Sequence, residues 1–294
     1  MVAEIISGKE IAESIRAELK DEIAKLKAEK NLTPGLGVIL VGEDPASQVY
    51  VGQKSKGCEE VGIFEETIRM PEDTSEQTLL DKINELNNDP KFHGILVQLP
   101  LPKHIDEKKV INTISPEKDV DGFHPVNVGK LMIGEKAFLP CTPHGVQQML
   151  IRSGNDPAGK HVVVVGRSNI VGKPMTNILL QKKDGANATV TICHTGTPDI
   201  SKFTKEADIV IAAAGRPNTI TADMVKDGVV VIDVGVNRVD APETKRGFRL
   251  VGDVDFEAVK EKAKAISPVP GGVGPMTVTM LLVNTTESAK RTLG

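Results

Sequence analysis

The most informative part of this sequence is the stretch His161-Val162-Val163-Val164-Val165-Gly166-Arg167-Ser168-Asn169-Ile170-Val171-Gly172-Lys173-Pro174. A run of β-branched residues, typical of a buried strand, ends at Gly166, and the signals of a helix start follow it. Backbone N–H groups at a helix start favour a pyrophosphate, and glycine allows the phosphate to come close. The stretch therefore predicts the phosphate-binding turn of a Rossmann-type dinucleotide domain, with an ordinary strand-to-helix turn as the alternative.

This turn departs from the usual Gly-x-Gly-x-x-Gly fingerprint, because Ser168 stands at the second glycine position and Gly172 comes late. NAD-selective domains carry an acidic residue at the end of the next strand, where this chain has Thr195 instead. Arg167 is a permanent planar cation, and it would suit a 2′-phosphate together with the Thr195 hydroxyl. The pattern therefore favours NADP over NAD, and the alternative is that Arg167 is a solvated surface residue.

Composition limits the classes of function that the chain can have. It has 294 residues, 39% hydrophobic and 26% charged, which is ordinary for a globular protein with room for two domains. A net charge of −4 without a basic run argues against nucleic acid, and no apolar run approaches the ~20 residues of a membrane span. Three distant cysteines and histidines without ligand spacing argue against a disulfide framework or a metal site. We therefore expect a cytoplasmic protein with small-molecule partners.

Strands alternate with helices along the whole chain, which predicts parallel α/β sheets. Ser7 and Glu10 form a candidate capping box, and Asp44-Pro45 is a candidate start of a second helix. A later helix is expected over Met175 to Gln181. The expected strands lie at 36–41, 63–69 and 94–100 in the first half, and at 161–165, 189–193, 208–213 and 229–234 in the second.

These patterns predict two α/β domains. We place a catalytic domain at 1–145 and a Rossmann-type domain at 146–274, with the boundary near Pro140-Cys141-Thr142-Pro143. The last helix, 275–294, is expected to pack back on the first domain.

The first half carries a candidate substrate constellation. Tyr50 and Lys54 share one helix face, so they are either an aromatic platform beside a proton donor or a core-covering side chain beside a solvated lysine. Tyr-x-x-x-Lys also occurs in short-chain dehydrogenases, but there the pair follows the glycine turn, whereas here it precedes the turn. Gln98 ends a predicted parallel strand, at the edge that faces a ligand crevice in open sheets. Asp121 is either a turn residue or an acceptor for an amino-pyrimidinone edge.

A third loop, Pro268 to Thr277, contains three glycines and three prolines in ten residues. Such a loop forms a wall poor in side chains that a flat ligand can approach. A disordered linker is the alternative, and the apolar helix expected after it argues against that alternative.

At these residues the chain resembles the bifunctional methylenetetrahydrofolate dehydrogenase/methenyltetrahydrofolate cyclohydrolase family over nearly its whole length. Several long motifs in order are far more specific than one glycine turn. The motifs are Tyr50-Val51-Gly52-Gln53-Lys54, Val97-Gln98-Leu99-Pro100-Leu101-Pro102, Lys118-Asp119-Val120-Asp121-Gly122, Pro140-Cys141-Thr142-Pro143, Val165 to Pro174, and Pro268 to Thr277.

The resemblance implies a cytosolic homodimer whose two α/β domains hold a tetrahydrofolate derivative in a cleft between them. It implies Lys54 as the catalytic lysine, Gln98 as its assistant, Tyr50 as a stacking platform and Asp121 as the group that holds the pterin. Further substrate contacts would be Val51, Gly52, Gln53, Val97, Leu99, Pro270, Gly271, Gly272, Val273 and Gly274. The NADP contacts would be Gly166, Arg167, Ser168, Thr195 and Ile232.

The implied activity is NADP-dependent oxidation of 5,10-methylenetetrahydrofolate to the 5,10-methenyl compound, followed by hydrolysis to 10-formyltetrahydrofolate. This is a pair of reactions of one-carbon metabolism. The alternatives are an enzyme of the same family with only one of the two activities, a non-catalytic folate- or NADP-binding module, and a metal-dependent hydrolase.

Overall fold

The computed structural model describes residues 3–244 and 247–294 and divides the chain into two compact units. One unit contains the residues up to Ala12 together with Thr142–Thr277, and we call it the large-sheet unit. The other contains Glu13–Cys141 and Val278–Gly294, and we call it the small-sheet unit. The N-terminal segment thus belongs to the same unit as the dinucleotide turn, and the C-terminal segment belongs to the same unit as Lys54.

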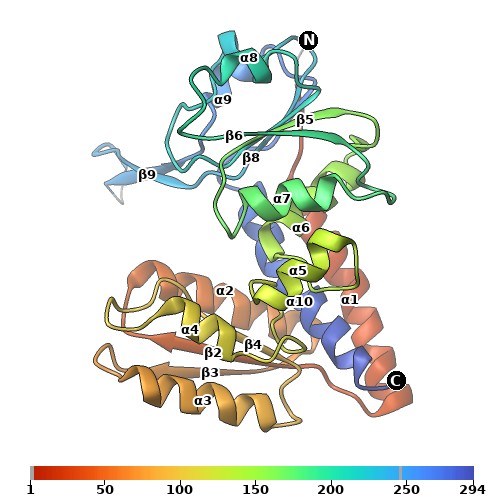
Figure 1. The fold of residues 1–294 in the computed structure, drawn as a ribbon, viewed down its shortest axis with the longest axis vertical. Coiled ribbons are helices and arrows are strands. Elements are labelled where there is room, and N and C mark those ends of the chain that lie inside the picture. Colours follow the sequence, from red (N-terminus) through yellow and green to blue (C-terminus); the bar gives the residue numbers. More distant parts are fainter. Residues whose placement is uncertain (1–2, 245–246) are drawn as a thin grey trace. The chain divides into compact units, whose positions relative to one another are not determined.

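The small-sheet unit is a parallel sheet with the strand order β3–β2–β4. Every residue of β2 (Gly35–Val41) is buried, as expected for a central parallel strand with both faces covered. Figure 1 shows α2 on one face of this sheet and α3 on the other. The other elements are α2 (Pro45–Val61), β3 (Phe64–Met70), α3 (Glu76–Asn88), β4 (Gly94–Val97), α4 (Glu107–Thr113) and α5 (Pro125–Ile133).

Helix α2 begins where the sequence predicts. The Asp44 carboxylate accepts a hydrogen bond from Ser47 N at 2.7 Å, and Pro45 occupies the first turn, where no backbone N–H is needed. The helix ends at Gly62, whose φ of 89° is left-handed. This cap fixes the helix that carries Tyr50 and Lys54.

The large-sheet unit is built on a parallel sheet with the order β1–β11–β8–β7–β5–β6. Because β6 and β7 flank β5 on opposite sides, the chain reverses its winding direction after β6, which makes the end of β5 the switch point where such sheets bind ligands. The strands are β1 (Glu4–Ile5), β5 (His161–Val165), β6 (Thr189–Cys193), β7 (Ile209–Ala212), β8 (Val230–Asp233) and β11 (Ala265–Ile266). The remaining elements are α6 (Cys141–Arg152), α7 (Gly172–Leu179), α8 (Ser201–Thr204), the short helix Ala222–Met224, α9 (Phe256–Val259) and an antiparallel hairpin of β9 (Asn237–Asp240) and β10 (Phe248–Val251).

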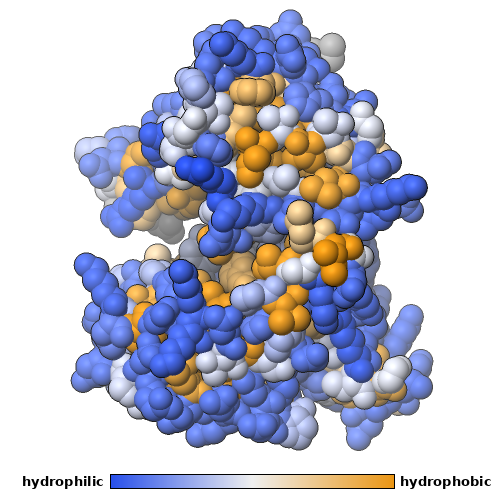
Figure 2. Space-filling view, in the orientation of Figure 1, coloured by the Kyte–Doolittle hydropathy of each residue, from blue (hydrophilic) through white to orange (hydrophobic). Residues whose placement is uncertain are grey.

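Two long helices contribute residues to both units, namely α1 (Gly8–Lys30) and α10 (Val273–Arg291). Within the small-sheet unit, Asn284 on α10 donates from Nδ2 to Val120 O at 2.8 Å and to Leu139 O at 2.9 Å. In the part of the chain that the structure describes, every helix is too short or too polar to cross a membrane. Figure 2 shows polar and charged residues over most of the visible face, with apolar side chains interspersed.

The predicted fold class, α/β units with parallel sheets, is confirmed. The strands predicted at 161–165 and 189–193 match β5 and β6, and Ser7 Oγ accepts from Glu10 N at 3.3 Å as in a capping box. The helix expected over Met175 to Gln181 instead runs from Gly172 to Leu179, and the hydrogen bond from Val171 N to Ser168 Oγ at 3.1 Å supports its earlier start. The division into 1–145 and 146–274 stays a prediction.

Candidate functional site

A buried lysine is the centre of the candidate site in the small-sheet unit. Lys54 on α2 is 8% exposed, and its Nζ donates a hydrogen bond to Gln98 Oε1 at 2.9 Å. Gln98 follows the last residue of β4, and its Nε2 donates to Leu99 O at 2.6 Å, which turns the amide oxygen toward the lysine. The structure therefore brings together two predicted residues that lie 44 positions apart.

Burial lowers the pKa of Lys54, and the Asp121 carboxylate, Cys141 and Cys58 oppose that shift. Burial also raises the pKa of Asp121, while the Lys54 ammonium and a hydrogen bond with Cys141 lower it. Each charge is thus desolvated and faces the other. An amine in such surroundings releases its proton more readily than a solvated lysine, which is the property that proton transfer near neutrality requires.

The two thiols beside Lys54 are architectural. Cys58 and Cys141 are free and buried. Burial raises the pKa of Cys58 to about 12 and raises the pKa of Cys141 well above its usual range. Because the thiolate is the reactive form, these cysteines remain neutral packing groups.

The Asp119 carboxylate, two residues before Asp121, holds the turn that carries Asp121. The sequence analysis did not predict this role for Asp119. Asp119 is 2% exposed and accepts hydrogen bonds from Phe123 N, His124 N and Asn127 Nδ2 at 3.2, 2.8 and 2.8 Å. Burial raises its pKa to about 6. The Asp-x-Asp-Gly pattern was a usable signal, since Asp side chains often bind the backbone of their own turn.

The other predicted substrate residues of the small-sheet unit divide into surface and core. Tyr50 lies one turn before Lys54 on α2 and is 41% exposed. Gln53 is exposed, and Gly52 and Leu99 are half-buried. Val51 and Val97 are buried core residues.

The loop 270–274 is held firmly within the large-sheet unit. Gly271 O accepts from Lys9 N at 3.0 Å, and α10 begins at Val273. These contacts argue against the disordered-linker alternative. Pro270 is exposed, whereas Gly272 and Val273 are buried.

The dinucleotide turn follows β5 with the close packing that its glycines allow. A Cβ on Gly166 would collide with Ala213 O, and a Cβ on Gly172 would collide with Gly166 O. Ser168 Oγ accepts from Val171 N at 3.1 Å and from Gly172 N at 3.4 Å, so a hydroxyl caps the start of α7. The first and third glycines of the usual fingerprint thus have their counterparts here, and the second position has a capping residue instead.

Three of the predicted cofactor residues, Arg167, Ser168 and Thr195, are exposed around this turn. Ile232 differs, because it is completely buried in β8. A turn with two closely packed glycines and an exposed guanidinium, at the start of a helix, fits a phosphate-bearing dinucleotide. Among residues 3–244 and 247–294, no group of three or more His, Cys, Asp or Glu side chains is placed to hold a metal ion.

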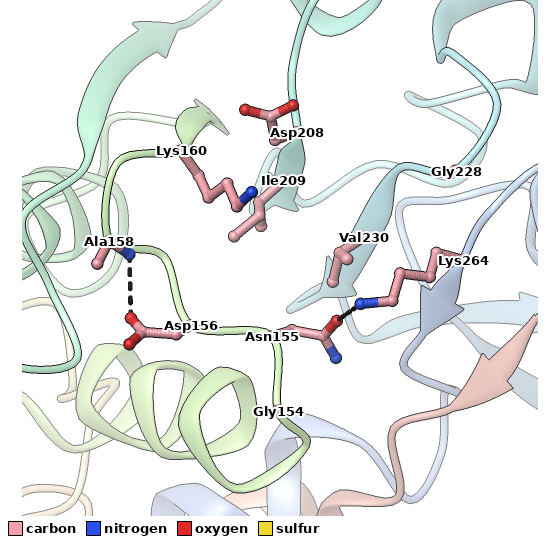
Figure 3. Close-up of a pocket in the computed structure, with 10 residues that line it drawn as sticks. All are labelled: Gly154, Asn155, Asp156, Ala158, Lys160, Asp208, Ile209, Gly228, Val230 and Lys264. Atoms are coloured by element: carbon pink, nitrogen blue, oxygen red, sulfur yellow. Dashed lines mark hydrogen bonds between the residues drawn. The ribbon is translucent and has the colours of Figure 1, made fainter.

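A separate cavity of about 460 Å³ lies at the opposite, amino-terminal ends of β5, β7, β8 and β11 (Figure 3). Its polar groups largely satisfy one another: Lys264 Nζ donates to Asn155 Oδ1 at 2.9 Å, and Asp156 Oδ1 accepts from Ala158 N at 3.0 Å. The dinucleotide turn lies at the carboxyl end of β5, so this cavity is at the opposite edge of the sheet from it.

Two family models match the chain. The catalytic domain of tetrahydrofolate dehydrogenase/cyclohydrolase matches residues 6–121, and the NAD(P)-binding domain of the same family matches residues 140–293. The chain belongs to the tetrahydrofolate dehydrogenase/cyclohydrolase family. The predicted family and a nicotinamide cofactor are thereby confirmed, and the catalytic-domain match covers Tyr50, Lys54, Gln98 and Asp121.

Individual family members are similar over their full length. The bifunctional protein FolD of Syntrophus aciditrophicus is 61% identical, with 100% of both chains covered, and that of Moorella thermoacetica is 60% identical, with 99% of this chain and 100% of the relative covered. The crystal structure of the bifunctional FolD enzyme from Campylobacter jejuni has a TM-score of 0.93 at 49% identity, with 99% of both chains covered. The Trypanosoma brucei methylenetetrahydrofolate dehydrogenase-cyclohydrolase, solved with NADP cofactor and inhibitor, has a TM-score of 0.93 at 41% identity, with 100% of this chain and 99% of that chain covered.

Proposed function

We propose that this member of the family oxidises 5,10-methylenetetrahydrofolate to the methenyl compound with NADP and then hydrolyses it to 10-formyltetrahydrofolate. Family membership supports the reaction pair, since relatives at about 60% identity are named bifunctional. The single observation that carries the proposal is the buried Lys54 ammonium, hydrogen-bonded to Gln98 at 2.9 Å and facing Asp121.

The oxidation needs alignment more than acid–base chemistry. When bound, NADP accepts the hydride that leaves the one-carbon bridge between N5 and N10 of the folate. The chain has to hold two flat rings face to face, and ideal alignment of reactants contributes up to ~7–11 kcal/mol. Tyr50, exposed one turn from Lys54, would stack on the folate, and Asp121 would accept hydrogen bonds from the pterin.

The hydrolysis needs proton transfer. Water attacks the cationic one-carbon bridge, the bond to N5 breaks, N5 gains one proton and one proton is released to solvent. Lys54 in its neutral form would take a proton from the attacking water, and its ammonium form would return one to N5. Gln98 would hold the amine at the reacting carbon through its 2.9 Å hydrogen bond.

The remaining assignments extend this arrangement. We propose that Val51, Gly52, Gln53, Val97, Leu99 and the loop 270–274 shape the folate site. The dinucleotide would be held by Gly166, Ser168, Thr195 and Ile232. Arg167 would bind the 2′-phosphate that distinguishes NADP from NAD.

Assays of both reactions on one preparation test the proposal. Absorbance assays with methylenetetrahydrofolate plus NADP or NAD, and with the methenyl compound alone, measure oxidation and hydrolysis separately. We expect both activities, with NADP preferred. Oxidation without hydrolysis, or the reverse, would favour the alternative of a single activity, and the absence of both would refute the proposal.

Two finer expectations remain proposals. We propose a homodimer, supported by β6 at one end of the sheet order and by the exposed apolar side chains of Ile192, on that strand, and Leu180, after α7. Multi-angle light scattering would test it, and a mass near the 31.5 kDa of one chain would refute it.

A cytoplasmic location is proposed on the sequence pattern alone, and fractionation of cells would test it.

A further inference from the structure

Two buried carboxylates lie beside each other where β8 ends and the hairpin returns to the sheet. Asp233 is 3% exposed and Asp253 is completely buried. Asp233 accepts from Gly235 N, Asp253 N and Val254 N, each at 2.9 Å. The side chain of one aspartate thus binds the backbone of the other.

The packing between the two turns is reciprocal. A Cβ on Gly252 would collide with the Asp233 carboxylate, and a Cβ on Gly235 would collide with Asp253 Oδ1. The segments Asp233-Val234-Gly235 and Gly252-Asp253 therefore interlock, with each glycine leaving room for the carboxylate of the other segment. Such close approach is geometrically specific and fixes the position of both side chains.

Asp253 uses its second oxygen on a different part of the molecule. Its Oδ2 accepts from Ala214 N at 2.6 Å and from Gly215 N at 2.8 Å, while Oδ1 accepts from Asn237 Nδ2 at 2.8 Å. Ala214 and Gly215 come just after β7. One carboxylate therefore holds the loop after β7 to the hairpin by charge-assisted hydrogen bonds.

That loop touches the dinucleotide turn. Ala213 N donates to Val165 O at 2.8 Å, and Ala213 O packs so closely on Gly166 that no side chain would fit between them. The carboxyl ends of β5 and β7 form the switch point at which a dinucleotide crosses such a sheet. The geometry points to Asp253 as a positioning residue of the cofactor site: it holds the 213–215 backbone in place against Gly166. This inference rests on the proposed binding of NADP at that turn.

Three variants test it in the full-length protein: Asp253→Asn, Gly235→Ala and, as the matched control, Asp255→Asn. Asp253→Asn removes the charge that receives two backbone N–H groups. Gly235→Ala displaces the same carboxylate without changing any charge. Asp255 is two residues away and caps α9 through Ala258 N, so its variant also loses a carboxylate cap but leaves Ala214 and Gly215 untouched.

The measurements are the Kd for NADP by calorimetry, the KM and kcat of oxidation, and the rate of methenyl hydrolysis. We expect Asp253→Asn and Gly235→Ala each to raise the Kd and KM for NADP at least tenfold, with kcat changed less than threefold and hydrolysis within twofold. Asp255→Asn should leave all four quantities within twofold of the unsubstituted protein.

An NADP Kd within twofold of the unsubstituted protein in either test variant would overturn the inference. A uniform loss of NADP affinity and hydrolysis would also overturn it, because it would indicate a general structural role. If Asp253→Asn does not fold, Gly235→Ala decides. If the unsubstituted protein binds NADP but oxidises no folate, the proposed function fails while the comparison of Kd values still tests the inference.

Discussion

Lys54 and Asp253 are both buried charged groups, but their surroundings differ. Asp253 accepts hydrogen bonds from the backbone N–H groups of Ala214 and Gly215 and from the side-chain amide of Asn237, so fixed donors occupy both of its oxygens. Lys54 donates to one side-chain amide, and burial lowers its pKa against the opposing effect of Asp121. A buried charge saturated by backbone donors serves architecture, whereas a desolvated charge facing another titratable group stays available for proton transfer.

The largest effect should come from removing the available charge. Lys54→Met keeps an unbranched side chain, one atom shorter, that cannot carry a proton, so methenyl hydrolysis should fall by about 10²–10⁴-fold, the usual contribution of a positioned acid–base group. The Kd for NADP should stay within twofold. Lys56→Met, an exposed lysine on the same helix, is the matched control. Unchanged hydrolysis in Lys54→Met would remove this lysine from the mechanism.

Asp233, the buried carboxylate beside Asp253, should contribute to the pH dependence of the free energy of unfolding. Burial raises the pKa of Asp233 from 3.8 to about 6, so between these values the folded protein retains a proton that the unfolded chain has released. This proton contributes to the free energy of unfolding below about pH 4, and its contribution is lost as the pH rises through about 6. The difference between the two pKa values corresponds to a contribution of about 3 kcal/mol. Asp233→Asn should remove this component from the pH dependence of the free energy of unfolding.

Urea unfolding from pH 4 to 7 measures the slope, and Asp240→Asn, an exposed carboxylate of the same unit, is the control. Asp119 contributes a similar component, since burial raises its pKa to about 6 as well, so the slope should be reduced rather than abolished. Equal slopes for Asp233→Asn and the unsubstituted protein would contradict the assignment.

A smaller effect is expected on the difference between the affinities for NADP and NAD. Arg167→Ala removes an exposed guanidinium at the dinucleotide turn, so the Kd for NADP should rise about tenfold, near 1.4 kcal/mol, while that for NAD changes little. Calorimetric titration with both cofactors measures the difference. Arg249→Ala, another exposed arginine of the large-sheet unit, should alter neither affinity. Equal losses for NADP and NAD would refute the 2′-phosphate role.

The smallest effect is a change in pH profile. Gln98→Glu places a carboxylate where the amide oxygen lies 2.9 Å from Lys54 Nζ, which favours the ammonium form and raises the pKa of Lys54. If neutral Lys54 is the base, the rising limb of the hydrolysis rate against pH should move to higher pH. Gln48→Glu adds the same charge at an exposed position of α2 and should leave the limb in place. A limb that does not move in Gln98→Glu would exclude the coupling.

Local signals in the chain were enough to predict most strands of the two parallel sheets, the start of α2 and the candidate residues. Asp44-Pro45 predicts the start of α2, and the β-branched run before Gly166 predicts β5, because capping and strand propensity act between near neighbours. The long motifs identified the family. The two-residue strands β1 and β11 were missed, since so short a segment has no periodicity to detect.

Contacts between segments that are distant in the sequence could not be predicted from such local signals. The hydrogen bond from Lys54 to Gln98 spans 44 positions, and the bond from Ala214 to Asp253 spans 39. Residue types and spacing predicted that Lys54 and Gln98 matter, but nothing in the spacing distinguished Asp253 from a surface aspartate. Burial and hydrogen-bond partners depend on which strands lie side by side, and that order arises only when the sheets assemble.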